Sequence, residues 1–369
     1  MAEPIGIGLI GCGNVAELRH LPALGALSDA RVVALADPDS RNLETLGSRY
    51  QVRQLYAEAG ALLEDPAVEV VGVLVPAALH AEVVLAAVEA GKHVLVEKPL
   101  ALSTADCARM SERADRSAGK VAVAFNLRAH RLVRRARELL ADGLVGPVES
   151  IAGTLVGGDF GGVDRWQGWR LERRLGGGAL FEKGAHHYDL WRLLTGSEAI
   201  EVSAISREAG ASDLATMVSA RMASGALATT TLGDYGPSIN RMIALGPRGR
   251  LELSLLEFDG LRFTPTSAQP GDARTRLRGL GNFLRELPRG LRMIRQGGEY
   301  GVTYRREWEL FLDAIRNDRF VECTLEDGRK ALEIALAAVA STVAGRTTAT
   351  ADAPPDLSSA LAADTTALE

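Results

Sequence analysis

The chain has few cysteines and lacks both a secretory signal pattern and a long apolar run. Its three cysteines, Cys12, Cys107 and Cys323, lie far apart and form no CxxC spacing. Neither a disulfide framework nor a cysteine-based zinc site is therefore expected, and a reducing, cytoplasmic location is favoured. The N-terminus has no basic region followed by an apolar run and a cleavage site, so no secretory signal is expected. No window of 18 uncharged apolar residues occurs, so no membrane span is expected either.

The chain also has no excess of positive charge. The 42 basic and 47 acidic residues give a net charge of −5, so a nucleic-acid partner is not expected. Few of the basic residues are lysines, which makes a lysine at the end of a buried strand notable. The length of 369 residues suggests two domains at roughly 150 residues each.

Apolar runs alternate with helix-like segments over the first 125 residues. Strands are predicted at residues 5–10, 31–36, 54–56, 68–75, 93–96 and 121–124. Continuous apolar strands separated by helices are typical of a parallel sheet covered on both faces. Residues 1–125 are therefore predicted to form a doubly wound α/β domain of the Rossmann type.

The pattern changes after residue 125. Several β-rich segments between residues 148 and 258 have the spacing of antiparallel strands, and helical segments surround them. Residues 126–346 are therefore predicted to form an α+β domain for substrate binding and oligomerisation. Its C-terminal helix is a candidate to pack back on the first domain. Residues 347–369 are expected to be a flexible tail.

One segment is strongly basic. Residues 262–299 hold eight arginines against Asp272, Glu286 and Glu299, and apolar residues recur among them at helical spacing. Two interpretations stay open. The segment is either a surface for an acidic group, a partner or a membrane face, or an inserted helix that packs its apolar stripe on the domain.

A glycine-rich turn follows the first predicted strand. Gly11, Gly13 and Ala16 form the pattern G-x-G-x-x-A, and Asn14 and Val15 begin the next helix. The first glycine allows a tight turn, the second allows the backbone to approach a pyrophosphate, and the small third residue allows close packing. These five residues are predicted to bind the pyrophosphate of a dinucleotide at the helix N-terminus.

Asp37 ends the second predicted strand. Its carboxylate could accept hydrogen bonds from ribose hydroxyls and would repel a 2′-phosphate, which favours NAD over NADP. Arg41 lies nearby in the sequence and could accommodate NADP. Alternatively, Asp37 is only a turn residue before Pro38.

Two further predicted strands lead into turns that carry polar residues. The strand at residues 68–75 leads through Val75 and Pro76 to His80, and the next strand leads into Glu97, Lys98 and a proline. Open α/β sheets bind ligands at the carboxyl ends of their strands, so these five residues are predicted to line the cofactor site.

These motifs resemble the Gfo/Idh/MocA family of oxidoreductases. The resemblance rests on the glycine turn, on Glu97-Lys98-Pro99 and on the segment from Gly176 to Asp189, and it covers about residues 4–346. The family implies a Rossmann domain followed by a domain with a large, open, mostly antiparallel sheet. It also implies NAD(P)-dependent oxidoreduction of sugars, cyclitols or related polyols by a homo-oligomer, a dimer or tetramer.

The same resemblance assigns Lys98 and His186 as active-site residues, with Glu182 where the family usually has aspartate. Glu182 and His186 are four positions apart, so on a helix they share a face. His186 is favoured as the base that takes the hydroxyl proton, with Glu182 orienting it and Lys98 stabilising the developing alkoxide. The alternative makes Lys98 the base.

Other polar residues surround this segment. His187 is expected to pack rather than to react, and Asp189 is expected either to bind substrate, to orient His186 or to be structural. Glu182, His186 and His187 are metal-ligand types, but neighbouring histidines diverge by roughly 100° on a helix, so no metal is expected. Asn126, Arg128, Trp166 and Arg170 are the remaining candidates for substrate contact, and the arginines suggest that the carbohydrate-like substrate is anionic.

Three functions remain open at this stage. The chain could be a dehydrogenase for a sugar, cyclitol, sugar acid or nucleotide sugar. It could instead be a non-catalytic sensor of NAD(P), or a glycosidase that uses NAD for a transient oxidation.

Overall fold

The computed structural model describes residues 3–157, 172–209, 212–268, 273–295 and 298–362. The chain forms two compact units. One comprises Met1–Asn126 with Thr303–Leu332, and the other comprises Leu127–Val302 with Glu333–Glu369. The first unit thus takes in residues 303–332, which were expected to lie in the second domain.

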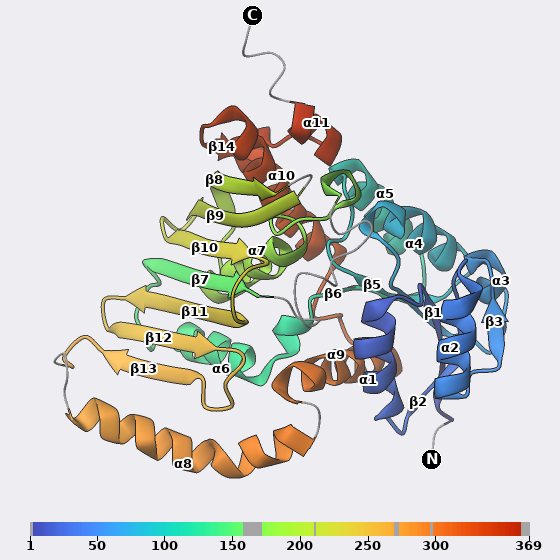
Figure 1. The fold of residues 1–369 in the computed structure, drawn as a ribbon, viewed down its shortest axis with the longest axis horizontal. Helices are drawn as coiled ribbons and strands as arrows, with labels where there is room; N and C mark the ends of the chain where they lie inside the picture. Colours follow the sequence, from blue (N-terminus) through green and yellow to red (C-terminus); the bar gives the residue numbers. More distant parts are fainter. Residues whose placement is uncertain (1–2, 158–171, 210–211, 269–272, 296–297, 363–369) are drawn as a thin grey trace, which may run out of the picture. The chain divides into compact units, whose positions relative to one another are not determined.

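A six-stranded parallel sheet forms the first unit, with the order β3-β2-β1-β4-β5-β6 (Figure 1). Its strands are β1 (Ile5–Ile10), β2 (Ala30–Ala36), β3 (Gln54–Tyr56), β4 (Val70–Val73), β5 (His93–Glu97) and β6 (Val121–Ala124). Every residue of β1, β4 and β6 is buried, as a sheet covered on both faces requires. The predicted Rossmann architecture is confirmed, and the strand order reverses between β1 and β4, where such sheets bind ligands.

The helices of this unit are α1 (Leu21–Gly25), α2 (Ser40–Tyr50), α3 (Ala59–Leu63), α4 (His80–Glu89), α5 (Thr104–Asp115) and the part of α9 (Gly298–Arg316) from Thr303 onward. The helix after the glycine turn begins at Asn14, as predicted, but it is not a regular α-helix. It contains a π-helical turn, η1 (Ala16–His20), and ends at Gly25. Pro22 lacks an N–H group and cannot continue the α-helical hydrogen bonding, which accounts for the wider turn before it.

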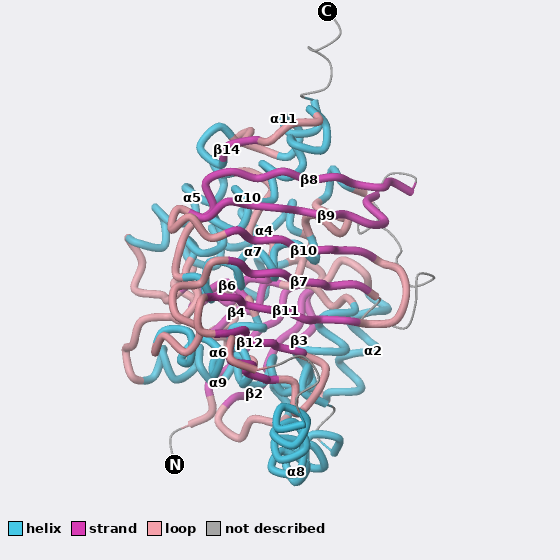
Figure 2. Tube along the Cα trace, turned by 90° about the vertical axis from the view of Figure 1, so that its left-hand side faces the viewer, coloured by secondary structure: helices cyan, strands magenta, loops and turns pink. Residues whose placement is uncertain are grey.

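The second unit contains an eight-stranded sheet with the order β13-β12-β11-β7-β10-β9-β8-β14. Its strands are β7 (Ser150–Val156), β8 (Ala199–Ala209), β9 (Ser212–Met222), β10 (Leu227–Gly233), β11 (Ile239–Gly246), β12 (Gly249–Ser254), β13 (Leu261–Pro265) and β14 (Thr348–Ala349). Only β7 and β10 pair in parallel, so the predicted mostly antiparallel sheet is confirmed. Figure 2 shows β8, β9, β10, β7, β11 and β12 side by side in this order.

One face of this sheet carries the helix α7 (Glu182–Thr195), which contacts β7 and β10. Side chains alternate between buried and exposed along β10 and β11, as they do in a sheet with one covered face. Some of the exposed positions of the sheet carry apolar side chains. Two of them, Ile205 and Met217, are directly paired across β8 and β9.

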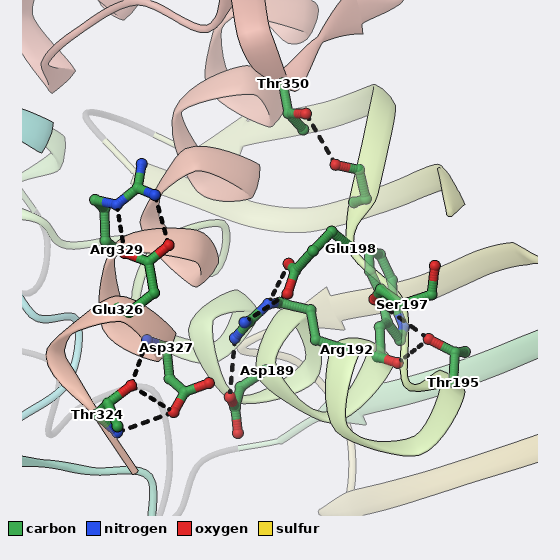
Figure 3. Close-up of polar contacts among 12 residues, drawn as sticks. Asp189, Arg192, Thr195, Ser197, Glu198, Thr324, Glu326, Asp327, Arg329 and Thr350 are labelled. Atoms are coloured by element: carbon green, nitrogen blue, oxygen red, sulfur yellow. Dashed lines mark hydrogen bonds and ion pairs between the residues drawn. The ribbon is translucent and has the colours of Figure 1, made fainter. Parts of the chain in front are cut away.

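The C-terminal segment carries secondary structure as far as residue 362. Thr348 and Ala349 form β14 on the open edge of β8, and the Thr350 hydroxyl donates a hydrogen bond of 2.8 Å to the Ala199 carbonyl (Figure 3). A short helix, α11 (Leu357–Ala362), buries Leu357. Residues 348–362, expected to be part of a flexible tail, therefore include a short strand and a short helix. An exposed strand edge offers unpaired N–H and C=O groups that a polar segment can satisfy.

Among the residues that the structure describes, no helix has both the length and the apolar character needed to cross a membrane.

Candidate functional site

The glycine turn packs tightly on one side and is open on the other. Gly11 has φ +97°, and a Cβ there would lie 2.7 Å from the carbonyl carbon of Leu74 and 2.9 Å from the amide nitrogen of Val75. Ala16 is fully buried. In contrast, Gly13 is exposed, and a Cβ there would have nothing within 4 Å. The turn is therefore open at Gly13, and binding of a pyrophosphate there stays a prediction.

Asp37 holds this turn in place. Its Oδ2 accepts a 2.6 Å hydrogen bond from the amide of Cys12, and its Oδ1 accepts a 2.8 Å bond from the amide of Asp39. The side chain therefore has the turn role that the sequence offered as an alternative. Each carboxylate oxygen can accept a second bond, so the contact with a ribose stays a prediction. Arg41 is exposed in the first turn of α2.

His80 joins the turns that follow β4 and β5. Its Nε2 lies 2.8 Å from the Val75 carbonyl, and its Nδ1 lies 3.0 Å from the Pro99 carbonyl and 3.2 Å from that of Leu100. The ring is buried, and burial lowers its pKa below 6.5 although these carbonyls act in the opposite direction. The contacts give His80 a structural role, while Val75 and Pro76 are half-exposed beside it.

A chain of buried hydrogen bonds leads to Lys98. The indole N–H of Trp308 donates to His20 Nδ1 at 3.1 Å, and His20 Nε2 lies 3.0 Å from Glu97 Oε1. Because an indole nitrogen can only donate, His20 Nδ1 is an acceptor and Nε2 carries the proton that Glu97 accepts. The other oxygen of Glu97 accepts a 3.0 Å bond from the Lys98 backbone amide. The backbone at Lys98 is thus fixed from the interior of its own unit.

Two buried carboxyl groups in this region have pKa values that are shifted in opposite directions. Burial alone would raise the pKa of Glu97, but the hydrogen bond from His20 and the nearby charge of Lys98 outweigh it and lower that pKa below 4.5. Burial, followed by the charge of Glu97, raises the pKa of Glu307 well above 4.5. Glu307 Oε2 is buried with no hydrogen-bond partner among the described residues. These shifts favour the ionised form of Glu97 and the neutral form of Glu307.

The second unit presents its candidates on α7. Glu182 and His186 occupy positions i and i+4 of this helix, as predicted, and both side chains are buried. The Lys183 amine donates to the carbonyls of Gly157 and Gly233 and pairs with Asp234 Oδ1 at 2.7 Å. Lys183 is therefore a buried connection to the sheet and not a solvated cation.

His187 also packs against the sheet. Its Nδ1 lies 2.8 Å from the Thr230 hydroxyl and its Nε2 lies 3.2 Å from Asn240 Oδ1. Burial lowers the pKa of His187 to about 4, although the bond to Asn240 acts in the opposite direction. The histidine is neutral, and these contacts give it a packing role.

Arg128 and Asp189 bind each other within the second unit. Arg128 Nε donates to Asp189 Oδ2 at 2.8 Å and its Nη2 donates to Oδ1 at 2.5 Å. Arg192 Nη1 lies 3.7 Å from the same carboxylate, and its Nε donates to Glu198 Oε2 at 2.6 Å (Figure 3). Because Asp189 balances the charge of Arg128, that arginine is a weaker argument for an anionic substrate than the sequence suggests.

The remaining substrate candidates divide into two groups. Asn126 is buried in the first unit, and its Nδ2 donates to the Thr303 hydroxyl at 2.9 Å. Trp166 and Arg170 lie outside the described residues. No group of three or more His, Cys, Asp or Glu side chains suited to a metal ion occurs in the part of the chain that the structure describes.

Three members of the buried network are not predicted from the sequence: His20, Trp308 and Glu307. His20 carries a weak signal, since it lies four residues after Ala16 on the helix that follows the glycine turn. Trp308 carries none, because 288 positions separate it from His20.

The two glycines of the turn are expected to respond differently to alanine. Gly13→Ala should weaken NAD binding by about tenfold or more, since a methyl group would occupy the space for the pyrophosphate, while the melting temperature stays near that of the wild type. Gly11→Ala should lower the melting temperature by several degrees because its Cβ would meet backbone atoms. Calorimetric NAD titration and thermal unfolding measure the two effects. Equal loss of stability in both variants would contradict this account.

Glu307→Gln should stabilise the protein increasingly as the pH rises. A raised pKa in the folded state stabilises the fold below the unfolded pKa, and that contribution is lost as the pH increases. Glutamine keeps the neutral form, so the gain over wild type should grow from pH ~5 to ~8 by up to about 1.4 kcal/mol per pH unit. Chemical denaturation at several pH values measures it, with the exposed Glu44→Gln as control. A gain independent of pH would contradict the neutral state of Glu307.

Two family models match the chain. One, described as "Oxidoreductase family, NAD-binding Rossmann fold", matches residues 5–125. The other, described as "GFO/IDH/MocA C-terminal domain", matches residues 133–252. Together they cover well over half of the chain.

Several curated proteins are similar in sequence. The myo-inositol 2-dehydrogenase of Thermotoga maritima is 28% identical over 90% of this chain and 94% of its own. A dTDP-3,4-didehydro-2,6-dideoxy-alpha-D-glucose 3-reductase of Actinomadura kijaniata is 31% identical over 68% of this chain and 74% of its own. The chain spans only 58% of an uncharacterized oxidoreductase of Rhizobium meliloti and 56% of a 1-carboxy-3-chloro-3,4-dihydroxycyclo hexa-1,5-diene dehydrogenase of Comamonas testosteroni.

Solved structures share the fold. An oxidoreductase domain protein from Kribbella flavida aligns with a TM-score of 0.81 at 23% identity over 95% of this chain and all of that one. The scyllo-inositol dehydrogenase of Lactobacillus casei, solved with NAD(H) and scyllo-inositol, aligns with a TM-score of 0.77 at 18% identity over 95% of this chain and all of that one. With both family models matched in order on the Rossmann unit and on the sheet that follows it, the chain belongs to the Gfo/Idh/MocA family of oxidoreductases.

Proposed function

We propose that this protein is an NAD(P)-dependent oxidoreductase that transfers a hydride between the nicotinamide and a hydroxyl or carbonyl group of a carbohydrate-like molecule. The substrate class is a sugar, cyclitol, sugar acid or nucleotide sugar. The named relatives support this range, since they include an inositol dehydrogenase and a reductase of a dTDP-sugar.

The observation that carries the proposal is the link between the glycine turn and Lys98 within one unit. The helix that begins at the turn carries His20, and His20 binds Glu97, whose other oxygen binds the Lys98 amide. A catalytic group must be held in a defined position relative to the cofactor for hydride transfer to be efficient. This arrangement supplies such a connection through buried hydrogen bonds.

In the direction of substrate oxidation, the proposed catalytic residues have the following roles. Bound NAD supplies the acceptor for the hydride that leaves the substrate carbon. His186 takes the hydroxyl proton and Glu182 orients the imidazole, so the substrate carbon becomes a carbonyl. Lys98 donates a hydrogen bond to the reacting oxygen and stabilises its developing negative charge. Lys98 as the base is the alternative within the same reaction.

The open face of the second sheet supports assembly into a homo-oligomer. Exposed apolar side chains, including Ile205 and Met217, lie together there, and such patches mark association surfaces. The three buried cysteines form no disulfide, which suits a reducing compartment such as the cytoplasm.

The test is a screen of purified protein with NAD and NADP against inositols, sugars, sugar acids and nucleotide sugars. Net formation of NADH, followed by absorbance, is the expected result with at least one class. Turnover of a glycoside without net NADH would instead indicate the glycosidase, and NAD binding without any turnover would indicate the sensor.

Lys98→Ala and His186→Ala should each lower kcat by at least about 10²-fold, because each removes a group that moves or stabilises charge at the reacting oxygen. NAD affinity, measured by calorimetry, should stay within a few fold of the wild type. Lys120→Ala is a matched control, since that amine pairs with Asp318 at the surface. Wild-type rates in both active-site variants would refute the assignment.

Asp37→Ala should reduce the preference for NAD over NADP by about tenfold, since it removes a carboxylate that repels a 2′-phosphate. The ratio of kcat/KM with the two cofactors measures this preference. Affinity for both should also fall somewhat, because Asp37 holds the Cys12 amide. Asp115→Asn, exposed at the end of α5, controls for the loss of one charge. An unchanged ratio would remove the argument for NAD.

A further inference from the structure

The basic helix of the second unit is distinct from everything assigned above. Helix α8 (Ala273–Arg295) lies beyond β13 at the end of the sheet (Figure 1), and Figure 2 shows it nearly end-on. Its sequence holds seven arginines and a single acidic residue, Glu286. The family model of the C-terminal domain ends at residue 252, before this helix begins.

One side of α8 attaches it to its own unit. Asn282 Nδ2 donates to the Asp259 carbonyl at 3.1 Å, and the Phe283 ring packs on Phe258 with centroids 5.4 Å apart. Glu286 Oε2 accepts from Arg131 at 3.2 Å. These contacts attach α8 to its own unit without the leucines on the other side of the helix.

The opposite side is a stripe of exposed leucines. Leu277, Leu280, Leu284 and Leu291 have exposed fractions of 65%, 54%, 58% and 58%. Their spacings of three, four and seven residues place them in line along one helix face. The interpretation in which the apolar stripe packs on the domain is therefore wrong for these four residues.

The arginines beside the leucine stripe indicate what kind of partner binds it. Arg285 and Arg292 are exposed on the helix between the leucine stripe and the docked side. A second copy of α8 would bring arginines against arginines, which is unfavourable for association. Anionic lipid headgroups complement them, and an apolar stripe flanked by arginines is the pattern of a helix that lies in a bilayer interface.

We infer that α8 is a membrane-surface helix. It inserts the leucine stripe into the interface of an anionic bilayer while its arginines contact the headgroups. The protein would then work at a membrane surface without spanning it.

Vesicle co-sedimentation of the full chain tests this inference. Wild type should bind vesicles of phosphatidylcholine with phosphatidylglycerol, and binding should be weaker with phosphatidylcholine alone and at high salt. The double variant Leu280→Glu/Leu284→Glu should bind at least about tenfold more weakly, and Arg285→Glu/Arg292→Glu should lose the preference for anionic vesicles. Phe320→Glu replaces a fully exposed phenylalanine elsewhere and should leave binding unchanged.

Folding and assembly are checked in the same samples. Each variant should keep the wild-type melting temperature and the wild-type mass in analytical ultracentrifugation. A lower mass in Leu280→Glu/Leu284→Glu would assign the stripe to a second copy and overturn the proposal. Absence of vesicle binding by wild type would also overturn it and leave an acidic protein surface as the occupant.

Discussion

The candidate site depends on the buried hydrogen bond between His20 and Glu97. It joins the helix after β1 to the end of β5, and Trp308 fixes the tautomer of the imidazole that makes it. An isolated buried carboxylate would be costly, but here the ring and the Lys98 amide satisfy both oxygens. Burial and the charge of Glu97 raise the pKa of the neighbouring Glu307, which favours a single negative charge in this region.

Other contacts connect residues in the same way along the carboxyl edge of the parallel sheet. Asp37 binds the glycine turn, Gly11 lies against the backbone at Leu74 and Val75, and His80 joins Val75 to the turn after β5. Residues predicted to touch the cofactor thus also hold one another. This explains why several of them are buried or half-buried, while Gly13 and Asn14 are exposed.

The sequence predicts those parts of the fold that depend on interactions between residues close together in the chain. Apolar runs locate the parallel strands, the glycine pattern locates the turn, and the four-residue spacing of Glu182 and His186 locates one helix face. Contacts between distant segments leave no such pattern, so Trp308 is missed, and strand β14 is missed because its cause is the open edge of β8. The periodicity of α8 predicts an apolar stripe but cannot tell whether that stripe faces the protein or the surroundings.

A structure of the protein with bound NADH tests the central claim most directly. The account predicts the pyrophosphate against Gly13 and the nicotinamide C4 within about 4–5 Å of the Lys98 amine, close enough for both to act on one substrate carbon and its oxygen. The His20–Glu97 hydrogen bond should be intact in that complex. A dinucleotide bound away from the glycine turn, or a Lys98 amine directed away from the nicotinamide, would contradict it.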